Sequence, residues 1–160
     1  MKVGLCTSSR SERHLMEALQ KEIPNSELID VNSHGDAYRS MWDDILLIIP
    51  ADRSEMTRWA LQCFHNNIPF CHFYSGSFSY THTHDDINRW TIALMANMCF
   101  AESPAAVNNL HKMGIPNDRI LLTGGSHFDG ITMQDIEQHP VVVLQPYDLV
   151  LLNTETMGEG

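Results

Sequence analysis

Short apolar segments alternate along this chain with longer segments whose apolar residues recur at helical spacing. The clearest apolar segment is residues 45–49, a continuous run typical of a strand that is covered on both faces. The clearest helical segment follows Thr83, which with Asp86 has the spacing of a capping box. Strands that alternate with helices predict a parallel sheet with helices on both faces, an α/β Rossmann-like fold.

Seven segments have the composition of strands, and four helical segments lie between them. The predicted strands cover residues 2–7, 27–31, 45–49, 68–73, 99–101, 119–123 and 141–144. Helices are predicted after Ser11, from Glu55, after Thr83, and from Ser103 to Gly114. In the helix after Thr83 one apolar stripe is expected to face the core, and its members are Ile87, Trp90, Thr91, Leu94, Met95 and Met98.

Length and charge exclude several classes of protein. A chain of 160 residues fits one domain, and its net charge of −10 argues against binding to nucleic acids or anionic membranes. The sequence has no recognisable signal segment and no apolar run long enough to span a membrane, so a cytoplasmic location is expected. The four cysteines sit in apolar patterns without a CxxC pair, which predicts reduced, buried thiols.

Ligands of parallel α/β sheets bind at the edge formed by the carboxyl ends of the strands. In this chain that rule selects four loops, residues 8–12, 51–55, 74–86 and 124–127. In the first loop, backbone N–H groups around Ser8 and Ser9 favour an anion, and Arg10 adds a charge that suits a phosphate. The alternative is a serine-rich helix cap beside a solvated arginine.

Two charged groups in these loops are candidates for chemistry. Asp52, Arg53 and Glu55 directly follow the most apolar strand, where a purely structural turn needs no charges. The alternative is a helix start that acidic residues stabilise through the helix dipole. Asp85 and Arg89 have the i, i+4 spacing of an intrahelical ion pair, and the same spacing also suits two groups that point into a ligand cleft.

No metal or cofactor is predicted. Residues 82–86 read His-Thr-His-Asp-Asp and resemble the HxHxDH metal motif, but Ile87 stands where that motif has its last histidine. The chain also lacks GxGxxG, P-loop and GxSxG motifs, so dinucleotide binding, P-loop nucleotide binding and serine hydrolysis have no support.

Several motifs in one order resemble UDP-N-acetylglucosamine 2-epimerases, especially the hydrolysing branch that releases N-acetylmannosamine. The opening Ser8-Ser9-Arg10-Ser11-Glu12 is similar to that family's GTRAE loop, and Ala51-Asp52-Arg53-Ser54-Glu55 is similar to its GDRxE. Asn67-Ile68-Pro69-Phe70-Cys71-His72 matches NIPxxH, and Ser75-Gly76-Ser77 stands in place of a Gly-Gly-Glu loop. Asp85-Asp86-Ile87-Asn88-Arg89 matches an acidic pair followed by arginine, and residues 113–129 resemble the family's MGxxxxRI and VxGNPxxD run.

The resemblance implies the N-terminal half of a GT-B fold and a nucleotide or sugar-nucleotide ligand. It implies abstraction of the sugar C2 proton and loss of UDP, followed by hydration of a glycal. The implied acid–base residues are Asp52, Asp85 and Glu55. The implied ligand contacts are Ser8, Ser9, Arg10, Arg53, Ser75, Gly76, Arg89 and Gly124.

The sequence also departs from the family. A helix–strand–helix unit before Asp52 is missing, Ser77 replaces a glutamate, and Tyr74 stands where the non-hydrolysing branch has an acidic residue. Residues 1–140 are expected to form the domain, and 141–160 to resemble the start of a second domain whose remainder is absent. We therefore expect a nucleotide or sugar-nucleotide binding protein with reduced or lost catalysis.

Two alternatives remain open at this point. The chain could be an active UDP-sugar 2-epimerase or hydrolase subunit to which a partner supplies the missing half. It could also be a nucleoside 2-deoxyribosyltransferase-like enzyme, in which Asp52 and Glu55 supply the aspartate and the catalytic glutamate. The apolar runs at 141–144 and 149–152 further predict a homo-oligomer, most simply a dimer.

Overall fold

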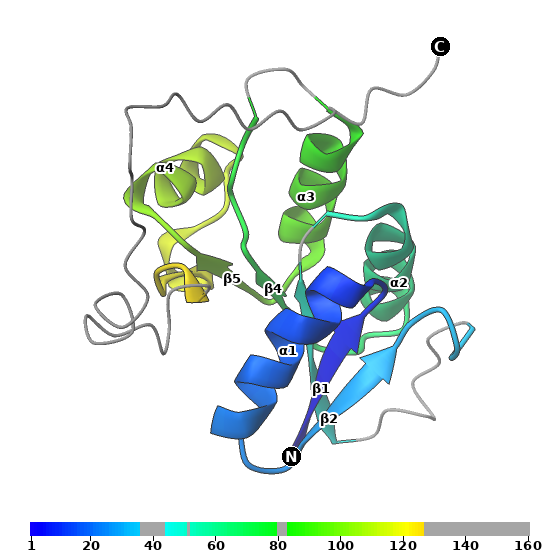
Figure 1. The fold of residues 1–160 in the computed structure, drawn as a ribbon. Helices are drawn as coiled ribbons and strands as arrows, with labels where there is room; N and C mark the ends of the chain where they lie inside the picture. The colour runs from blue at the N-terminus through cyan, green and yellow to red at the C-terminus, as the bar shows by residue number, and fades with distance from the viewer. Residues whose placement is uncertain (36–43, 51, 80–82, 127–160) are drawn as a thin grey trace, which may run out of the picture.

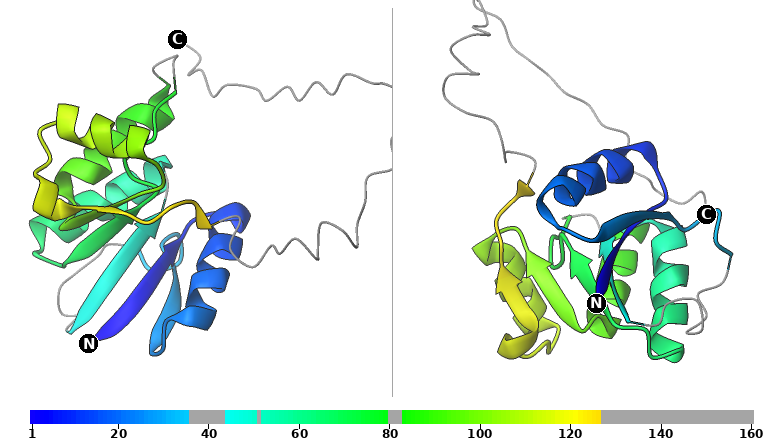
Figure 2. Two further views of the ribbon diagram at one scale, coloured as in Figure 1. Left: turned by 90° about the vertical axis from the view of Figure 1, so that its left-hand side faces the viewer. Right: turned by 90° about the horizontal axis from the view of Figure 1, so that it is seen from below.

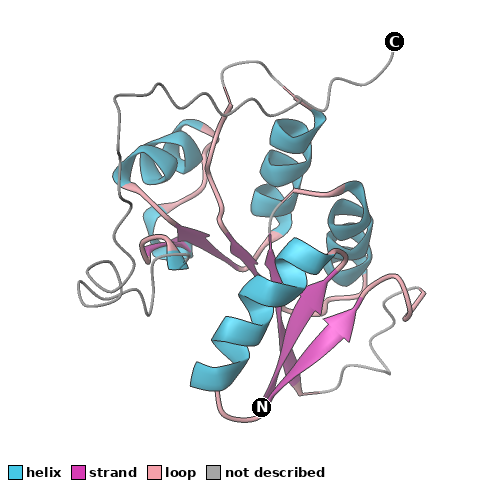
Figure 3. Ribbon diagram, viewed as in Figure 1, coloured by secondary structure: helices cyan, strands magenta, loops and turns pink. Residues whose placement is uncertain are grey.

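The computed structural model describes residues 1–35, 44–50, 52–79 and 83–126. In this part of the chain strands and helices alternate, except that no described helix lies between the second and third strands (Figure 3). The strands are β1 (Lys2–Thr7), β2 (Ser26–Asp30), β3 (Ile45–Pro50), β4 (Phe70–Phe73), β5 (Met98–Ala101) and β6 (Ile120–Leu122). The helices are α1 (Arg10–Glu22), α2 (Ser54–His65), α3 (His84–Met95) and α4 (Pro104–Lys112), with a short 3-10 helix η2 (Asn117–Arg119) before β6.

The strands form one parallel sheet in the order β2-β1-β3-β4-β5-β6 (Figure 1). This confirms the predicted α/β fold and six of the seven predicted strands within one or two residues at each end. The seventh, at 141–144, lies outside the described residues, as do the proposed boundary at 140 and the segments on which the predicted oligomer rests.

Helices cover both faces of the sheet, as predicted (Figure 2). On one face, α1 packs through Met16, Leu15 and Leu19 against side chains of β1, β2 and β3. On the other face, α2, α3 and α4 pack over the larger cluster of buried residues. The faces alternate along β3, where Leu47 and Ile49 point into the larger cluster and Ile48 into the smaller one.

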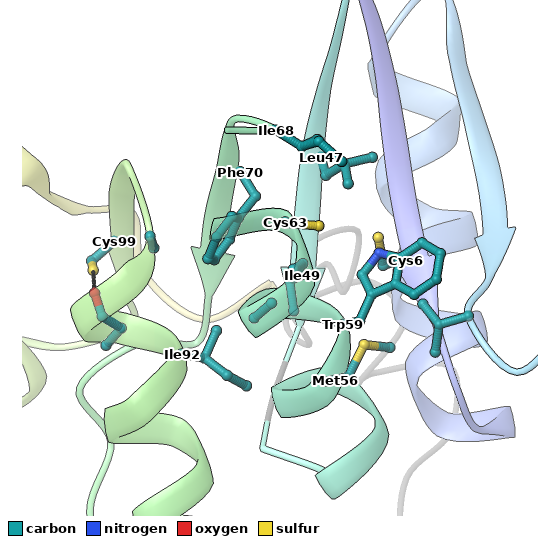
Figure 4. Packing of buried hydrophobic residues seen from close by; sticks show 14 of the residues in the cluster. Cys6, Leu47, Ile49, Met56, Trp59, Cys63, Ile68, Phe70, Ile92 and Cys99 are labelled. Atoms are coloured by element: carbon teal, nitrogen blue, oxygen red, sulfur yellow. Dashed lines mark hydrogen bonds between the residues drawn. The ribbon is translucent and has the colours of Figure 1, made fainter. Parts of the chain in front are cut away.

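The centre of the larger cluster is the contact between α2 and the middle of the sheet (Figure 4). Trp59 is fully buried beside Cys6, and Met56 and Cys63 extend the same face of α2 over β3. Burial of each such side chain contributes about 1.5–3 kcal/mol relative to its exposed state. This contact fixes α2, and therefore the loop that precedes it, relative to the strand ends.

All four cysteines are buried and unpaired by disulfide, in agreement with the prediction. Burial raises the pKa of the Cys63 thiol to about 12 and that of Cys71 to about 11. Thiols of this kind pack as apolar groups and are poor nucleophiles. Among the described helices, none has the length and apolar composition that a membrane span requires.

The predicted buried stripe of α3 is wrong in part. Ile87 and Leu94 are 51% and 55% exposed, and Met98 belongs to β5. The buried residues of α3 are instead Asp86, Ile92 and Ala93. The helix is rotated from the orientation that apolar spacing alone predicts, because Asp86 points inward and is satisfied there by hydrogen bonds.

Three helices begin at the carboxyl-terminal edge with a capped first turn. The side chains of Ser9, Thr83 and Ser103 each accept a hydrogen bond from a backbone N–H in the first turn of α1, α3 and α4 respectively. Such caps contribute about 1 kcal/mol each. They hold the strand-to-helix loops in place, which positions the side chains that those loops carry.

Gly76 allows the loop after β4 to pass close to α4. Its φ is +85°, and a Cβ at this position would lie 2.4 Å from the backbone oxygen of Ala106. Gly114 provides a matched control, since its φ is +83° but a Cβ there would meet nothing within 4 Å. Both positions require the left-handed backbone conformation, but only at Gly76 does the close approach of α4 also leave no room for a side chain.

We expect Gly76→Ala to lower the free energy of unfolding by about 3 kcal/mol, because conformational strain adds to overpacking. Gly114→Ala should cost about 1 kcal/mol, from conformational strain alone. Urea denaturation of both variants measures the difference. Equal losses would show that the close approach to α4 is unimportant.

Candidate functional site

Because all strands are parallel, the loops after β1, β3, β4 and β5 meet at one edge of the sheet (Figure 1). Asp52 follows β3 and Arg89 lies on α3, which the loop after β4 leads into. Arg10 and Asp52 therefore lie at the same edge. Gly124 follows β6 at this edge too, but three strand spacings, about 14 Å, separate β6 from β3, which exceeds side-chain contact.

Arg89 joins three segments of this edge. Its guanidinium forms an ion pair with the Asp52 carboxylate, and it donates a hydrogen bond to the backbone oxygen of Ser77 at 3.0 Å. It also contacts Asp86 Oδ1 at 3.4 Å. The side chains of Arg89 and Asp52 are only 16% and 20% exposed, so this ion pair is largely screened from water. The structure thus brings two of the predicted residues, Asp52 and Arg89, into direct contact.

Asp86 is a buried acidic residue beside Arg89, and it is not among the site residues that the sequence predicts. Its side chain is 1% exposed. It accepts hydrogen bonds from the Ser79 backbone N–H at 2.9 Å and the Ser79 hydroxyl at 2.5 Å. Asp86 therefore ties the loop after β4 to α3 and contacts Nη1 of Arg89, whereas Asp52 pairs with Nη2. The acidic pair at 85–86 is evident in the sequence, but apolar spacing predicted that Ile87 and Leu94 would face the core, and Asp86 faces it instead.

A hollow of about 450 Å³ lies between the starts of α2 and α3. The residues that line it are Asp52, Arg53, Ser54, Glu55, His84, Asp85 and Asn88. All three carboxylates that the sequence suggests for acid–base chemistry are among them. Arg53 and Glu55 form an exposed ion pair at 3.7 Å, a contact worth little in water.

The carboxylates of this hollow differ in their electrostatics. Burial raises the pKa of Asp52 above its usual range, Arg89 opposes the rise, and Asp85 and Glu12 add to it. The pKa of Glu55 is lowered, chiefly by a hydrogen bond from its own backbone N–H at the start of α2. Asp52 therefore takes up a proton more readily than a free aspartate does, and Glu55 less readily than a free glutamate does.

In the loop after β1, the donors that were expected to bind an anion are already occupied. The Ser8 backbone N–H and the Ser8 hydroxyl both donate to Glu12 Oε2, each at 2.7 Å. Ser9 caps α1 by accepting from the Glu12 backbone N–H at 3.3 Å. Arg10 is exposed. The structure thus favours the capping interpretation of Ser8 and Ser9 and leaves Arg10 facing solvent.

Ser75 and Gly76 support the loop after β4 from within. Ser75 is fully buried, and its hydroxyl lies 3.0 Å from His72 Nδ1. The Gly76 carbonyl accepts a hydrogen bond from Asn109 of α4 at 3.0 Å. Ser77, next in the loop, donates to the Glu102 carboxylate. Ser75 and Gly76 therefore shape the edge without facing its hollow.

Within the described residues no group of three or more potential ligands could hold a metal ion. Of the metal-like segment, His82 lies outside the described residues, and Thr83 serves as the cap of α3. The Asp86 carboxylate accepts hydrogen bonds from Ser79 and Arg89.

The model of the UDP-N-acetylglucosamine 2-epimerase family matches residues 28–152, more than half of the chain. The chain belongs to the UDP-N-acetylglucosamine 2-epimerase family. Membership agrees with the ordered motifs at residues 52–55 and 85–89 and favours this family over the deoxyribosyltransferases.

Solved epimerases share the fold. The epimerase of Neisseria meningitidis, bound to UDP-GlcNAc, is 17% identical with a TM-score of 0.66, over 81% of this chain and 47% of that one. That of Methanocaldococcus jannaschii, in complex with UDP-GlcNAc and UDP, is 18% identical with a TM-score of 0.65, over 79% and 47%. MnaA of S. aureus, in a structure with UDP, is 18% identical with a TM-score of 0.64, over 81% and 45%.

The chain spans about half the length of these epimerase structures. Its sheet and helices resemble the Rossmann-like N-terminal half of a GT-B fold, as the sequence predicted. The structural matches establish the fold. A search of curated protein sequences finds no significant match.

We expect Arg89→Met to lower the free energy of unfolding by about 3 kcal/mol. The substitution leaves the Asp52 and Asp86 carboxylates without their shared cation in a largely buried setting. Arg58→Met on the exposed side of α2 is the matched control and should change stability by less than about 0.5 kcal/mol. Chemical denaturation measures both. An Arg89→Met variant as stable as the control would show that the ion pair does not hold the edge together.

Proposed function

We propose that the edge formed by Asp52, Asp85 and Arg89 binds a sugar nucleotide, and that the chain alone has reduced or lost epimerase catalysis. The observation that carries the proposal is that Asp52 and Asp85 both line the hollow of about 450 Å³ between α2 and α3, while Arg89 holds Asp52 through an ion pair. Family membership supports UDP-N-acetylglucosamine as the first ligand to test. Structures of two epimerases with this fold contain that compound.

The side chains of the hollow suit the sugar portion of such a ligand. Carboxylate oxygens of Asp52 and Asp85 accept hydrogen bonds from sugar hydroxyls. Asp52, whose pKa burial raises, is the proposed residue for proton exchange with the sugar. Glu55, which stays ionised, serves as a further hydrogen-bond acceptor at the rim.

Two features argue for weakened chemistry. Departure of UDP places negative charge on a diphosphate, which fixed cations must stabilise. Arg89 is engaged by Asp52 and Asp86, and Arg53 by Glu55, so these cations face carboxylates of the chain itself. The loop after β4 also carries Tyr74 and Ser77 where related enzymes are expected to have an acidic residue.

The second candidate is an active UDP-sugar 2-epimerase or hydrolase subunit. The observation in its favour is that Asp52, Glu55 and Asp85 all line one hollow, which supplies carboxylates for acid–base work, while Arg53 and Arg89 are held by carboxylates of the chain. In that case a partner contributes groups that act on the diphosphate, and the carboxylates of this chain act on the sugar. Steady UDP release by the chain with such a partner, but not by the chain alone, distinguishes this candidate from a binding protein.

UDP-N-acetylglucosamine should stabilise the purified chain against thermal unfolding. Ligand at ten times its Kd contributes about 1.4 kcal/mol, which for a chain of this size raises Tm by about 3–5 °C. Asp85→Asn should reduce that shift at the same ligand concentration, because it removes a charged acceptor from the hollow. Asp118→Asn in η2, which is exposed, should leave it unchanged.

The same samples should release no UDP beyond the buffer background. Two results would contradict the proposal. One is the absence of any Tm shift with sugar nucleotides. The other is steady turnover by the chain alone that Asp52→Asn abolishes, which would establish an active enzyme.

A further inference from the structure

Glu12 is a buried carboxylate that is not among the proposed acid–base or ligand-binding residues. It lies in the first turn of α1 and is 5% exposed. Its Oε2 accepts both hydrogen bonds from Ser8, each at 2.7 Å. Its Oε1 is buried and has no hydrogen-bond partner. Buried carboxylate oxygens are normally satisfied, so this oxygen requires an explanation.

Helix capping accounts for only one of the two oxygens. In a capping box the glutamate of the first turn returns to the N–H of the cap residue, and its second oxygen is commonly solvated. Here Glu12 bypasses the cap residue, Ser9, and binds the preceding residue, Ser8, with a single oxygen. The capping contact of Ser9 is complete without Oε1. The loop after β1 therefore anchors Glu12 through Oε2 alone and makes no use of Oε1.

Glu12 lies at the same edge of the sheet as the hollow between α2 and α3, beside the loop that carries Asp52, although it does not line that hollow. β1 and β3 are neighbours in register, with Leu5 opposite Ile48, so the loops that carry Glu12 and Asp52 leave adjacent strand ends. The two carboxylates are near enough for Glu12 to contribute to the raised pKa of Asp52. Among the described residues, no Lys, Arg or His side chain forms an ion pair with Glu12.

We infer that Glu12 Oε1 accepts a hydrogen bond from a hydroxyl group of the sugar portion of the ligand. A hydroxyl donates to a carboxylate, whereas a phosphate is repelled by the group of carboxylates at this edge. Ser8 is partly exposed, and the last torsion of a glutamate side chain is soft, so a small turn presents Oε1 to a group bound beside Ser8. The inference rests on the proposed binding of a sugar nucleotide.

Isothermal titration of the full chain with UDP-N-acetylglucosamine and with UDP tests this assignment. Glu12→Gln keeps one oxygen for Ser8 and puts an N–H₂ group in place of Oε1. Its Kd for UDP-N-acetylglucosamine should rise at least about tenfold, the effect of losing one charge-assisted hydrogen bond, while its Kd for UDP changes by less than about threefold. Glu17→Gln, on the exposed side of α1 where Glu17 pairs with Arg13 at 3.7 Å, should bind both ligands as the wild type does.

The possible outcomes separate the two claims. If Glu12→Gln binds UDP-N-acetylglucosamine with wild-type affinity, or loses both ligands equally, Glu12 serves only the loop and the inference is overturned. If the wild type binds neither compound, the proposed function fails as well. If Glu12→Gln lacks a cooperative thermal transition, Glu12→Asp replaces it, since its shorter carboxylate keeps the charge but withdraws from the hydroxyl. Wild-type affinity in that folded variant would also overturn the inference.

Discussion

The ion pair between Arg89 and Asp52 joins the end of β3 to α3, and the rest of the candidate site is arranged around it. Arg89 is held in turn by Asp86 and by the backbone of Ser77, so one guanidinium fixes the loop after β3, the loop after β4 and the first turns of α3. A planar group with five donors suits three acceptors at once, which an ammonium on a flexible stem does not. Arg89 of α3 pairs with Asp52, which precedes α2, so this ion pair holds the two sides of the hollow together.

The fold brings these groups together through the geometry of parallel strands. Every loop that follows a strand emerges at the same edge, and capped helix starts follow three of these loops at once. Helix packing on one face, centred on Trp59, then fixes α2 beside α3. The result is an edge rich in carboxylates, with few cations left to face a phosphate. That balance favours contacts with the neutral sugar of a ligand over contacts with its diphosphate.

The sheet could be predicted from the sequence because its strands are short apolar runs that can be recognised without knowledge of distant residues. An example is 45–49, which ends at a proline and a charged loop. The sequence also placed Asp52, Glu55 and Asp85 at the edge where the structure has them. It failed at α3, where the inward residue is Asp86. Burial of that carboxylate depends on hydrogen-bond donors from Ser79 and Arg89. The spacing of apolar residues along a helix does not predict such partners. For the same reason the sequence could not show that Ser8 is occupied by Glu12 or that Ser75 is fully buried.

Ligand is expected to bind at the carboxyl-terminal edge of the sheet. A two-dimensional ¹H–¹⁵N NMR titration of the chain with UDP-N-acetylglucosamine tests it residue by residue. We expect the backbone resonances of Glu12, Asp52 and Asp85 to move together and saturate at one Kd, while those of Phe64 and Asn67, beside a hollow of about 400 Å³ at the opposite edge, stay in place. Shifts confined to that opposite edge, or no shifts at all, would contradict binding at the carboxyl-terminal edge.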